Sequence, residues 1–177
     1  MSKQEIIELL IKDHDAFIGY IHELNADEYI FSYQQKWTAG QQLAHILLCV
    51  KPLVQVLGMD QSSIAQQFGL SERPGSSYEE LLAEYMEKLK AGGKAPGRFL
   101  PEPASADQRA WLSESLRNTV NELCARIDRF EETDLDRLCV PHPLLGNLSL
   151  REMLYNVIHH VRHHHAMAEH NLQNLDA

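Results

Sequence analysis

The stretch that decides the fold is residues 149–170, SLREMLYNVIHHVRHHHAMAEH. It opens with Ser149 and Glu152 three residues apart, the capping-box pattern that marks the start of a helix. Apolar residues then recur at the three- and four-residue spacing of one helix face, for example at Leu154, Val157 and Val161. Six of the ten histidines of the chain fall between positions 159 and 170. The stretch predicts a final amphipathic helix over about 149–174 with histidines beside its buried face.

Three other segments begin with the same pattern of a hydroxyl residue followed by Gln or Glu. An earlier helix is expected over about 3–25, where apolar residues also keep helical spacing. A second one should start just after Trp37, and a shorter, more charged helix should end at Gly92 and Gly93. The three further capping boxes are TAGQ at 38–41, SYEE at 77–80 and SADQ at 105–108.

Four long helices and one short one indicate an all-α fold. We predict a four-helix bundle with an additional short helix in its long connection, formed by one domain over residues 1–177. Neither strand-like alternation nor a repeat of 20 to 50 residues stands out in the sequence. Helical bundles place ligand and metal sites in the core, so the candidate functional residues are polar residues that face inward.

Composition excludes several classes of partner. The formal charge is -9 and no Lys/Arg-rich run occurs, so a nucleic-acid partner is not expected. No signal peptide and no apolar run of about 20 residues is present, so we expect a cytoplasmic protein without a membrane partner. The three cysteines do not suggest a disulfide framework, and Cys49 and Cys124 are expected in the core.

The histidines of the last helix form two pairs with i, i+4 spacing, which lets two imidazoles reach one ion. These pairs are His159 with His163 and His160 with His164, and the second pair lies closer to the apolar stripe. A third ligand is needed, and His45 is the candidate because it lies in an apolar helical stretch. The alternative for His45 is a core histidine that is hydrogen-bonded to a backbone carbonyl.

Other histidines and arginines of the sequence are weaker candidates for a functional role. His142 could lie near the mouth of the site, although a role in stabilising its loop is the simpler interpretation. Arg151 and Arg162 could meet an anionic substrate, but solvent exposure is the simpler interpretation of both. His14 and His22 lie beside charged residues of the first helix and are also interpreted as surface residues. No general base is evident, so the catalytic residues are left unassigned.

Two segments carry a resemblance to a known family. KWTAGQQLAHI at 36–46 resembles the signature of the DinB-like superfamily, in which a Trp and a Ser or Thr open helix two and a histidine follows eight residues after the Trp. HPLLGNLSLREMLYNVIHHVRHHHAMA at 142–168 resembles the last helix of that family, a His-Pro-x-x-Gly entry followed by H-x-x-x-H. The resemblance implies a helical bundle that binds a divalent metal ion through His45, His160 and His164, and it makes a homodimer plausible.

Three neutral imidazoles leave the charge of the ion uncompensated and a coordination position open, as in catalytic sites. Such an ion lowers the pKa of a bound water or thiol. Members of the family are described as metal-dependent hydrolases and as thiol-dependent S-transferases or isomerases. We therefore expect a hydrolase or S-transferase that acts on a small molecule, with zinc or nickel as the ion and a low-molecular-weight thiol as a possible partner. The alternative is a non-catalytic metal-binding or stress-response protein.

Overall fold

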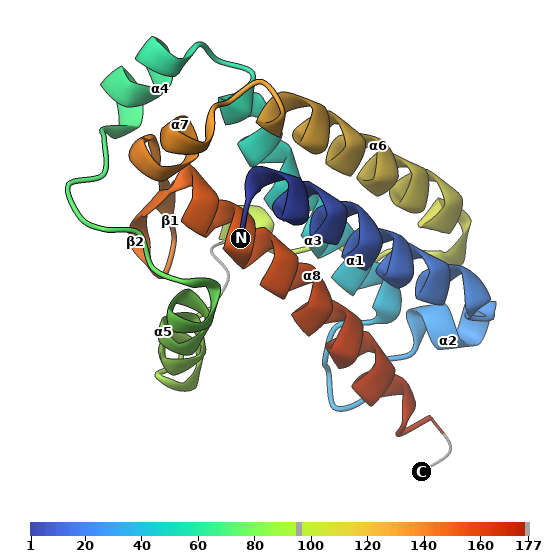
Figure 1. Cartoon of the computed structure of the whole chain (residues 1–177). Coiled ribbons are helices and arrows are strands. Elements are labelled where there is room, and N and C mark those ends of the chain that lie inside the picture. The colour runs from blue at the N-terminus through green and yellow to red at the C-terminus, as the bar shows by residue number, and fades with distance from the viewer. Residues whose placement is uncertain (95–96, 176–177) are drawn as a thin grey trace.

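The computed structural model of the chain describes residues 1–94 and 97–175, and four long helices form its body (Figure 1). They begin where the sequence predicts. Ser2, Thr38 and Ser149 each accept a hydrogen bond from the backbone N–H three residues on, and Ser105 opens a single turn, η2, that leads into the third long helix. The long helices are α1 (Lys3–Glu23), α3 (Ala39–Leu57), α6 (Arg109–Ile127) and α8 (Leu150–Leu172), and η2 is Ala106–Gln108.

The direction of the helices follows from the residues that they pair. Asp13 of α1 forms an ion pair with Arg162 of α8 at 2.8 Å, and Phe17 lies against His165 further along both helices. The helices α1 and α8 therefore run parallel. By contrast, Gln42 and then His45 of α3 meet His164 and then His160 of α8, so α3 and α8 run antiparallel. This arrangement confirms the predicted all-α bundle.

The long connection between α3 and α6 contains α4 (Gln61–Phe68), α5 (Tyr78–Lys90) and the short turn η1 (Gly97–Phe99). The predicted short helix is α5, and Ser77 caps it through a capping box with Glu80. It lies beside α8, apart from α1 and α6 (Figure 1). The sequence patterns missed α4 and two other short helices, α2 (Ala26–Ile30) and α7 (Glu132–Arg137).

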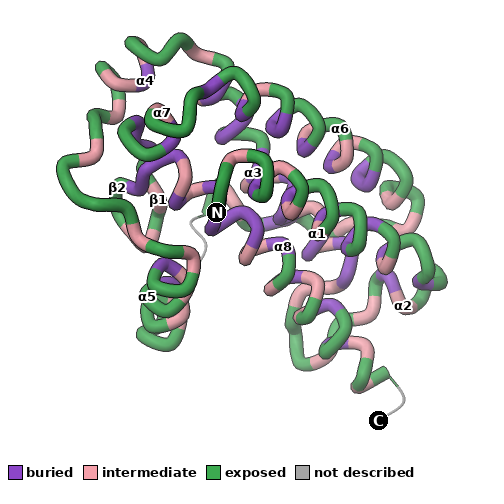
Figure 2. The backbone as a smooth tube through the Cα atoms, viewed as in Figure 1, coloured by how far each residue is buried: buried purple, intermediate pink, exposed green. Residues whose placement is uncertain are grey.

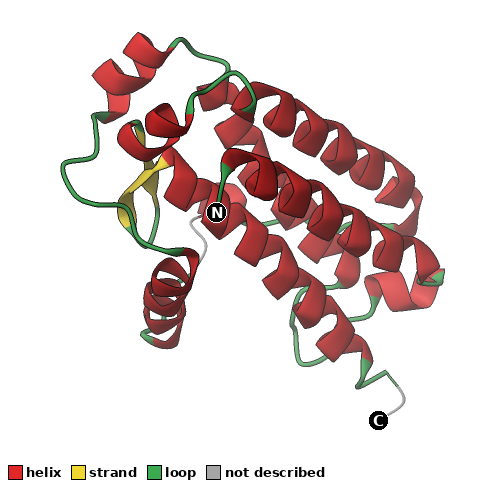
Figure 3. Ribbon diagram, in the orientation of Figure 1, coloured by secondary structure: helices red, strands yellow, loops and turns green. Residues whose placement is uncertain are grey.

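The expectation that the chain lacks strands is wrong for the segment before α8 (Figure 3). Strands β1 (Cys139–His142) and β2 (Gly146–Ser149) pair antiparallel, with His142 opposite Gly146. Gly146 adopts φ +74, which glycine accepts without the steric cost that a Cβ would cause. Two strands of four residues are too short to show alternation, and the prolines and the glycine of residues 141–146 are typical of an irregular turn.

The buried residues lie on the inward faces of the helices (Figure 2), and the apolar side chains among them form one core. Aliphatic residues dominate it, and Phe17 and Tyr29 are its largest fully buried members. No single helix among residues 1–94 and 97–175 combines the length and apolar character of a membrane span, although α3 and α4, bent by 115°, meet those criteria as a pair.

One buried carboxylate joins the long connection to the start of α8. The Glu152 side chain is 2% exposed and accepts two hydrogen bonds from the Arg73 guanidinium at 2.8 and 3.1 Å. It also accepts hydrogen bonds from the backbone N–H of Ser76 and Ser149, both at 2.8 Å. Burial alone would raise the pKa of this carboxyl, but the hydrogen bonds and the guanidinium outweigh burial and lower it.

We expect Glu152→Gln to destabilise the protein at pH 7 by about 2 kcal/mol, because a neutral amide cannot accept all four hydrogen bonds and places an N–H against other donors. The folded-state pKa of Glu152 is lowered, so the carboxylate contributes stability above the unfolded pKa of about 4.3. That contribution is lost as the pH falls through the folded pKa. Urea unfolding of both proteins between pH 7 and pH 3 measures the difference, which should shrink below about pH 4.

Glu87→Gln is the matched control, because Glu87 pairs with Lys90 on an exposed face of α5, where its side chain is 72% exposed. Its free energy of unfolding should stay within about 0.5 kcal/mol of the wild type. An equal loss of stability in the two variants would contradict the role given to Glu152.

Candidate metal centre

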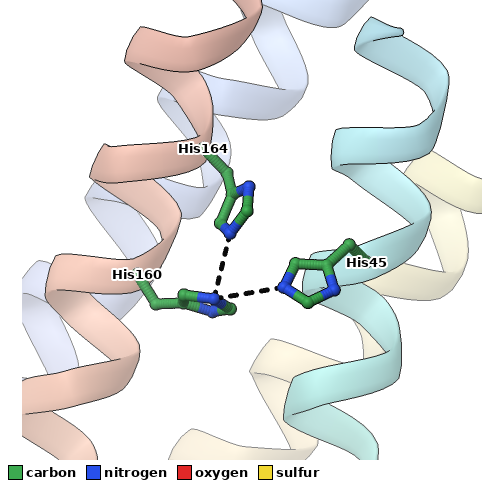
Figure 4. Close-up of side chains that lie close together, drawn as sticks. All are labelled: His45, His160 and His164. Carbon is green, nitrogen blue, oxygen red and sulfur yellow. Dashed lines mark hydrogen bonds between the residues drawn. The ribbon is translucent and has the colours of Figure 1, made fainter. Parts of the chain in front are cut away.

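Three histidines from two helices meet in the interior of the bundle (Figure 4). The Nε2 atom of His160 lies 3.2 Å from Nε2 of His45 and 3.0 Å from Nε2 of His164. One nitrogen of each ring lies within 4.8 Å of the other two. His45 and His164 are buried, and His160 is half-buried at the edge of a cavity. The structure thus brings together the three residues that the sequence selected.

Helix geometry explains why these side chains converge. His160 and His164 are one turn apart on α8, so their rings leave the helix on the same side. His45 lies seven residues after the Thr38 N-cap, and Ala39, Leu43 and Ile46 around it are buried. Because α3 faces α8 in antiparallel orientation, the inward face of one helix presents its imidazole to the pair on the other.

Oxygen atoms hold two of the rings in a defined tautomer. Nδ1 of His45 lies 2.7 Å from the backbone oxygen of Phe99, and Nδ1 of His164 contacts Oε1 of Gln42. An oxygen acceptor requires that the nitrogen carry the proton, so both rings present an unprotonated Nε2 to the centre. Burial lowers the pKa of all three histidines below 6.5, and most strongly for His160 and His164.

The three Nε2 atoms that meet at the centre cannot all be satisfied by hydrogen bonds among themselves. Nε2 of His45 and Nε2 of His164 both act as hydrogen-bond acceptors, and both approach Nε2 of His160. His160 can carry one proton on that atom and can donate it to one of them. A cation placed among the three nitrogens would interact favourably with all of their lone pairs. The donor set therefore fits a divalent metal ion, because neutral imidazole is its commonest protein ligand.

The separations of the nitrogens support this fit. In a tetrahedral zinc site with Zn–N bonds of about 2.0 to 2.1 Å, ligand nitrogens are about 3.3 to 3.4 Å apart. The two shortest separations here, 3.0 and 3.2 Å, are close to that value. Small side-chain shifts would complete the geometry, and the Phe99 oxygen and Gln42 amide would keep the orientation of their rings.

A cavity of about 870 Å³ opens from the three histidines. Going away from the site, α3 contributes Cys49, Val50 and Leu53 to its wall, and α8 contributes Val157 and Met153. Trp37 forms another part of the wall, and its ring centroid lies 4.8 Å from that of His45. A volume of this size is typical of small-molecule sites.

The remaining histidines of α8 take other positions. His159 packs edge-on against Tyr85 of α5, with 5.7 Å between the ring centroids, and His163 borders the cavity. His165 lies against Phe17 and Tyr20 of α1. The pair that faces His45 is therefore His160 with His164, while the pair one residue earlier faces α5 and the cavity edge.

His142 lines the cavity, as one of the two interpretations of the sequence suggests, and it also supports its own turn. Its Nδ1 accepts hydrogen bonds from the backbone N–H of Leu144 at 3.2 Å and of Leu145 at 3.1 Å. Burial lowers its pKa to about 4, so the ring is neutral at pH 7.

Three expectations about individual residues are wrong. His14 is 1% exposed, and its Nδ1 donates to the Leu10 oxygen at 2.8 Å, because its side chain turns toward the core although Asp13 and Asp15 flank it in the sequence. Arg151 does not face solvent, since its side chain is 13% exposed and bonds Glu132 and Asp136. Cys124 is buried as expected, but Cys49 lines the cavity with Sγ 3.6 Å from His45 Nε2.

Sequence reasoning overlooked the residues that hold the imidazoles. Gln42 precedes His45 by three positions and therefore shares its helix face, so helical spacing could have identified it. No sequence signal could have identified Phe99, because its backbone oxygen comes from a turn 54 residues away.

Comparison with known proteins agrees with this geometry. The family model described as the DinB superfamily matches residues 10–168, which include all three histidines of the site. A search of curated proteins finds no match. Because the family match covers most of the chain, the protein belongs to the DinB superfamily.

Proposed function

We propose that this protein is a metal-dependent enzyme in which His45, His160 and His164 bind one divalent ion, zinc or nickel. The observation that carries the proposal is the convergence of three Nε2 atoms, two of which are fixed as acceptors by oxygen partners on the opposite side of the ring. A structural role in the core would satisfy each imidazole with a donor or an acceptor of its own. This centre places all three nitrogens around one point instead.

The surroundings support a catalytic site more than a structural one. Three neutral imidazoles leave a coordination position free, and a bound ion would act there as a Lewis acid. The cavity begins at the same three histidines, so a small molecule in it reaches the centre. Its walls are mainly aliphatic and aromatic, so they offer apolar contact to a small organic molecule.

The reaction that we propose is hydrolysis or thiol-dependent S-transfer on a small molecule. The Phe99 oxygen orients the imidazole of His45, and Trp37 packs against the same ring. The Gln42 amide orients the imidazole of His164. His163 and His142 border the cavity and could exchange protons with a substrate. Among the described residues, no Asp or Glu lines this cavity. A general base in this cavity would therefore be a histidine rather than a carboxylate.

The metal site is tested by single alanine variants. We expect His45→Ala, His160→Ala and His164→Ala each to lower zinc affinity by more than about tenfold, because each removes one of three ligands. Competition with a chromophoric chelator, on protein purified without a tag, measures the affinity.

His159→Ala and His163→Ala are the matched controls on the same helix, and they should change zinc affinity by less than about threefold. The opposite result, with loss in these two variants and retention in His160→Ala and His164→Ala, would show that α8 turns a different face to the metal.

The metal-free protein should remain folded, because the apolar core extends through all four long helices and is separate from the three imidazoles. Chelation should preserve the helical circular dichroism at 25 °C and lower the melting temperature, since bound metal adds only a linkage contribution of about 2.7 kcal/mol at 100 times its Kd. Loss of the helical signal at 25 °C would instead identify the metal as structural.

The reaction class is tested by a screen of the metal-loaded protein. Several low-molecular-weight thiols are offered with an electrophilic small molecule, and ester and amide substrates are offered separately. We expect the wild-type protein to conjugate a thiol to the electrophile. The His45→Ala variant should show no conjugation with any of the thiols. Tight metal binding without turnover of any substrate would favour the alternative, a non-catalytic metal-binding or stress-response protein.

A further inference from the structure

The charged residues that line the cavity are all cationic. They are Lys36 before α3, Lys94 after α5 and Arg98 in η1, and no Asp or Glu among residues 1–94 and 97–175 lines the cavity. This is the reverse of the composition, since the chain has 25 acidic and 16 basic residues. The cavity is thus a positively charged opening in a protein with a formal charge of -9.

The structure shows no carboxylate partner for these cations within its described residues. Nine ion pairs of a Lys or Arg with a carboxylate are present there, and none involves Lys36, Lys94 or Arg98. The Arg98 guanidinium lies 4.8 Å from the centre of the neighbouring Phe99 ring, a contact that leaves its N–H donors available. By contrast, Arg73, Arg151 and Arg162 are all paired with carboxylates.

Two of these cations lie next to residues that contact a histidine of the centre. Lys36 precedes Trp37, whose ring packs on His45, and Arg98 precedes Phe99, whose oxygen holds the same ring. From His45, α3 runs through Cys49 and Val50 to Leu53, about 12 Å along the helix axis. The antiparallel α8 adds Val157 and Met153 on the way. The cavity therefore has cations near His45 and an aliphatic wall beyond it.

We propose that the cavity binds an amphipathic organic anion, with an acidic group held by Lys36 and Arg98 and an apolar body along the Val50–Leu53 wall. This assignment rests on the proposed function for the reaction that follows binding, and it names the substrate class of that site. Apolar contact supplies affinity, and the cations select charge, because an opening of one sign raises the local concentration of the opposite ion.

The test uses three ligands that share one apolar body and differ in charge: 4-phenylbutyrate, 4-phenylbutan-1-ol and 4-phenylbutylamine. The protein is chelator-treated, so that a carboxylate cannot gain affinity from a metal ion. Trp111 is replaced by Phe, which leaves Trp37 in the cavity wall as the single tryptophan, and its fluorescence reports binding. We expect the acid to bind at least about tenfold more tightly than the amine, with the alcohol between them and the preference weakened by salt.

Charge variants then locate the selectivity. Lys36 and Arg98 are exposed residues, so Lys36→Gln and Arg98→Gln should each weaken binding of the acid only about two- to fivefold, as expected for an exposed ion pair, and should leave binding of the alcohol unchanged. Lys12→Gln, which removes the same charge from an exposed position of α1 outside the cavity lining, should change neither. An equal loss in Lys12→Gln would trace the preference to net charge and overturn the proposal.

Equal affinity for acid and amine, or no binding of any of the three ligands, would also overturn it. These outcomes are independent of the metal proposal, because the ligand measurements contain no metal and the zinc titrations contain no ligand. Loss of zinc binding in the histidine variants with retained acid selectivity would support both proposals.

Discussion

The register of α3 against α8 is the constraint on which the site depends. A slip of one residue along either helix would turn His45 or the pair on α8 by about 100° and separate the three Nε2 atoms. The contact between Gln42 and His164 lies beside the contact between His45 and His160, so two points along the same interface agree on this register. Capping boxes fix where both helices begin, and the Glu152 carboxylate joins the start of α8 to the long connection.

The long connection contributes to the site as well as to the fold. Through Phe99 it supplies the oxygen that sets the tautomer of His45, and through Lys94 and Arg98 it supplies two of the cations of the cavity. Tyr85 of α5 supports His142 and His159 through edge-on ring contacts. The bundle helices therefore provide the buried nitrogens, and the connection provides orientation and charge. Both parts are needed for the chemistry that we propose.

The arrangement also explains how a metal site can coexist with a stable apolar core. Two of the three imidazoles have an oxygen partner and the third borders the cavity, so we expect the chain to bury these rings without an ion. The apolar contacts among α1, α3, α6 and α8 are formed by other residues of the same helices. Different residues of the same helices therefore form the apolar core and the candidate metal site.

The sequence by itself determined the helices and much of the candidate site. Capping boxes and apolar periodicity are local signals, so they located the long helices, and the same periodicity placed the pair His160 and His164 closer to the buried face than the pair His159 and His163. The hairpin before α8 and the short helices α2, α4 and α7 were missed because their segments are too short to show a period. Only the tertiary structure showed that His14 is buried, that Cys49 borders the cavity and that Phe99 holds His45. Those facts depend on which segments meet across the bundle, and a pattern within one segment contains no information about a partner 54 residues away.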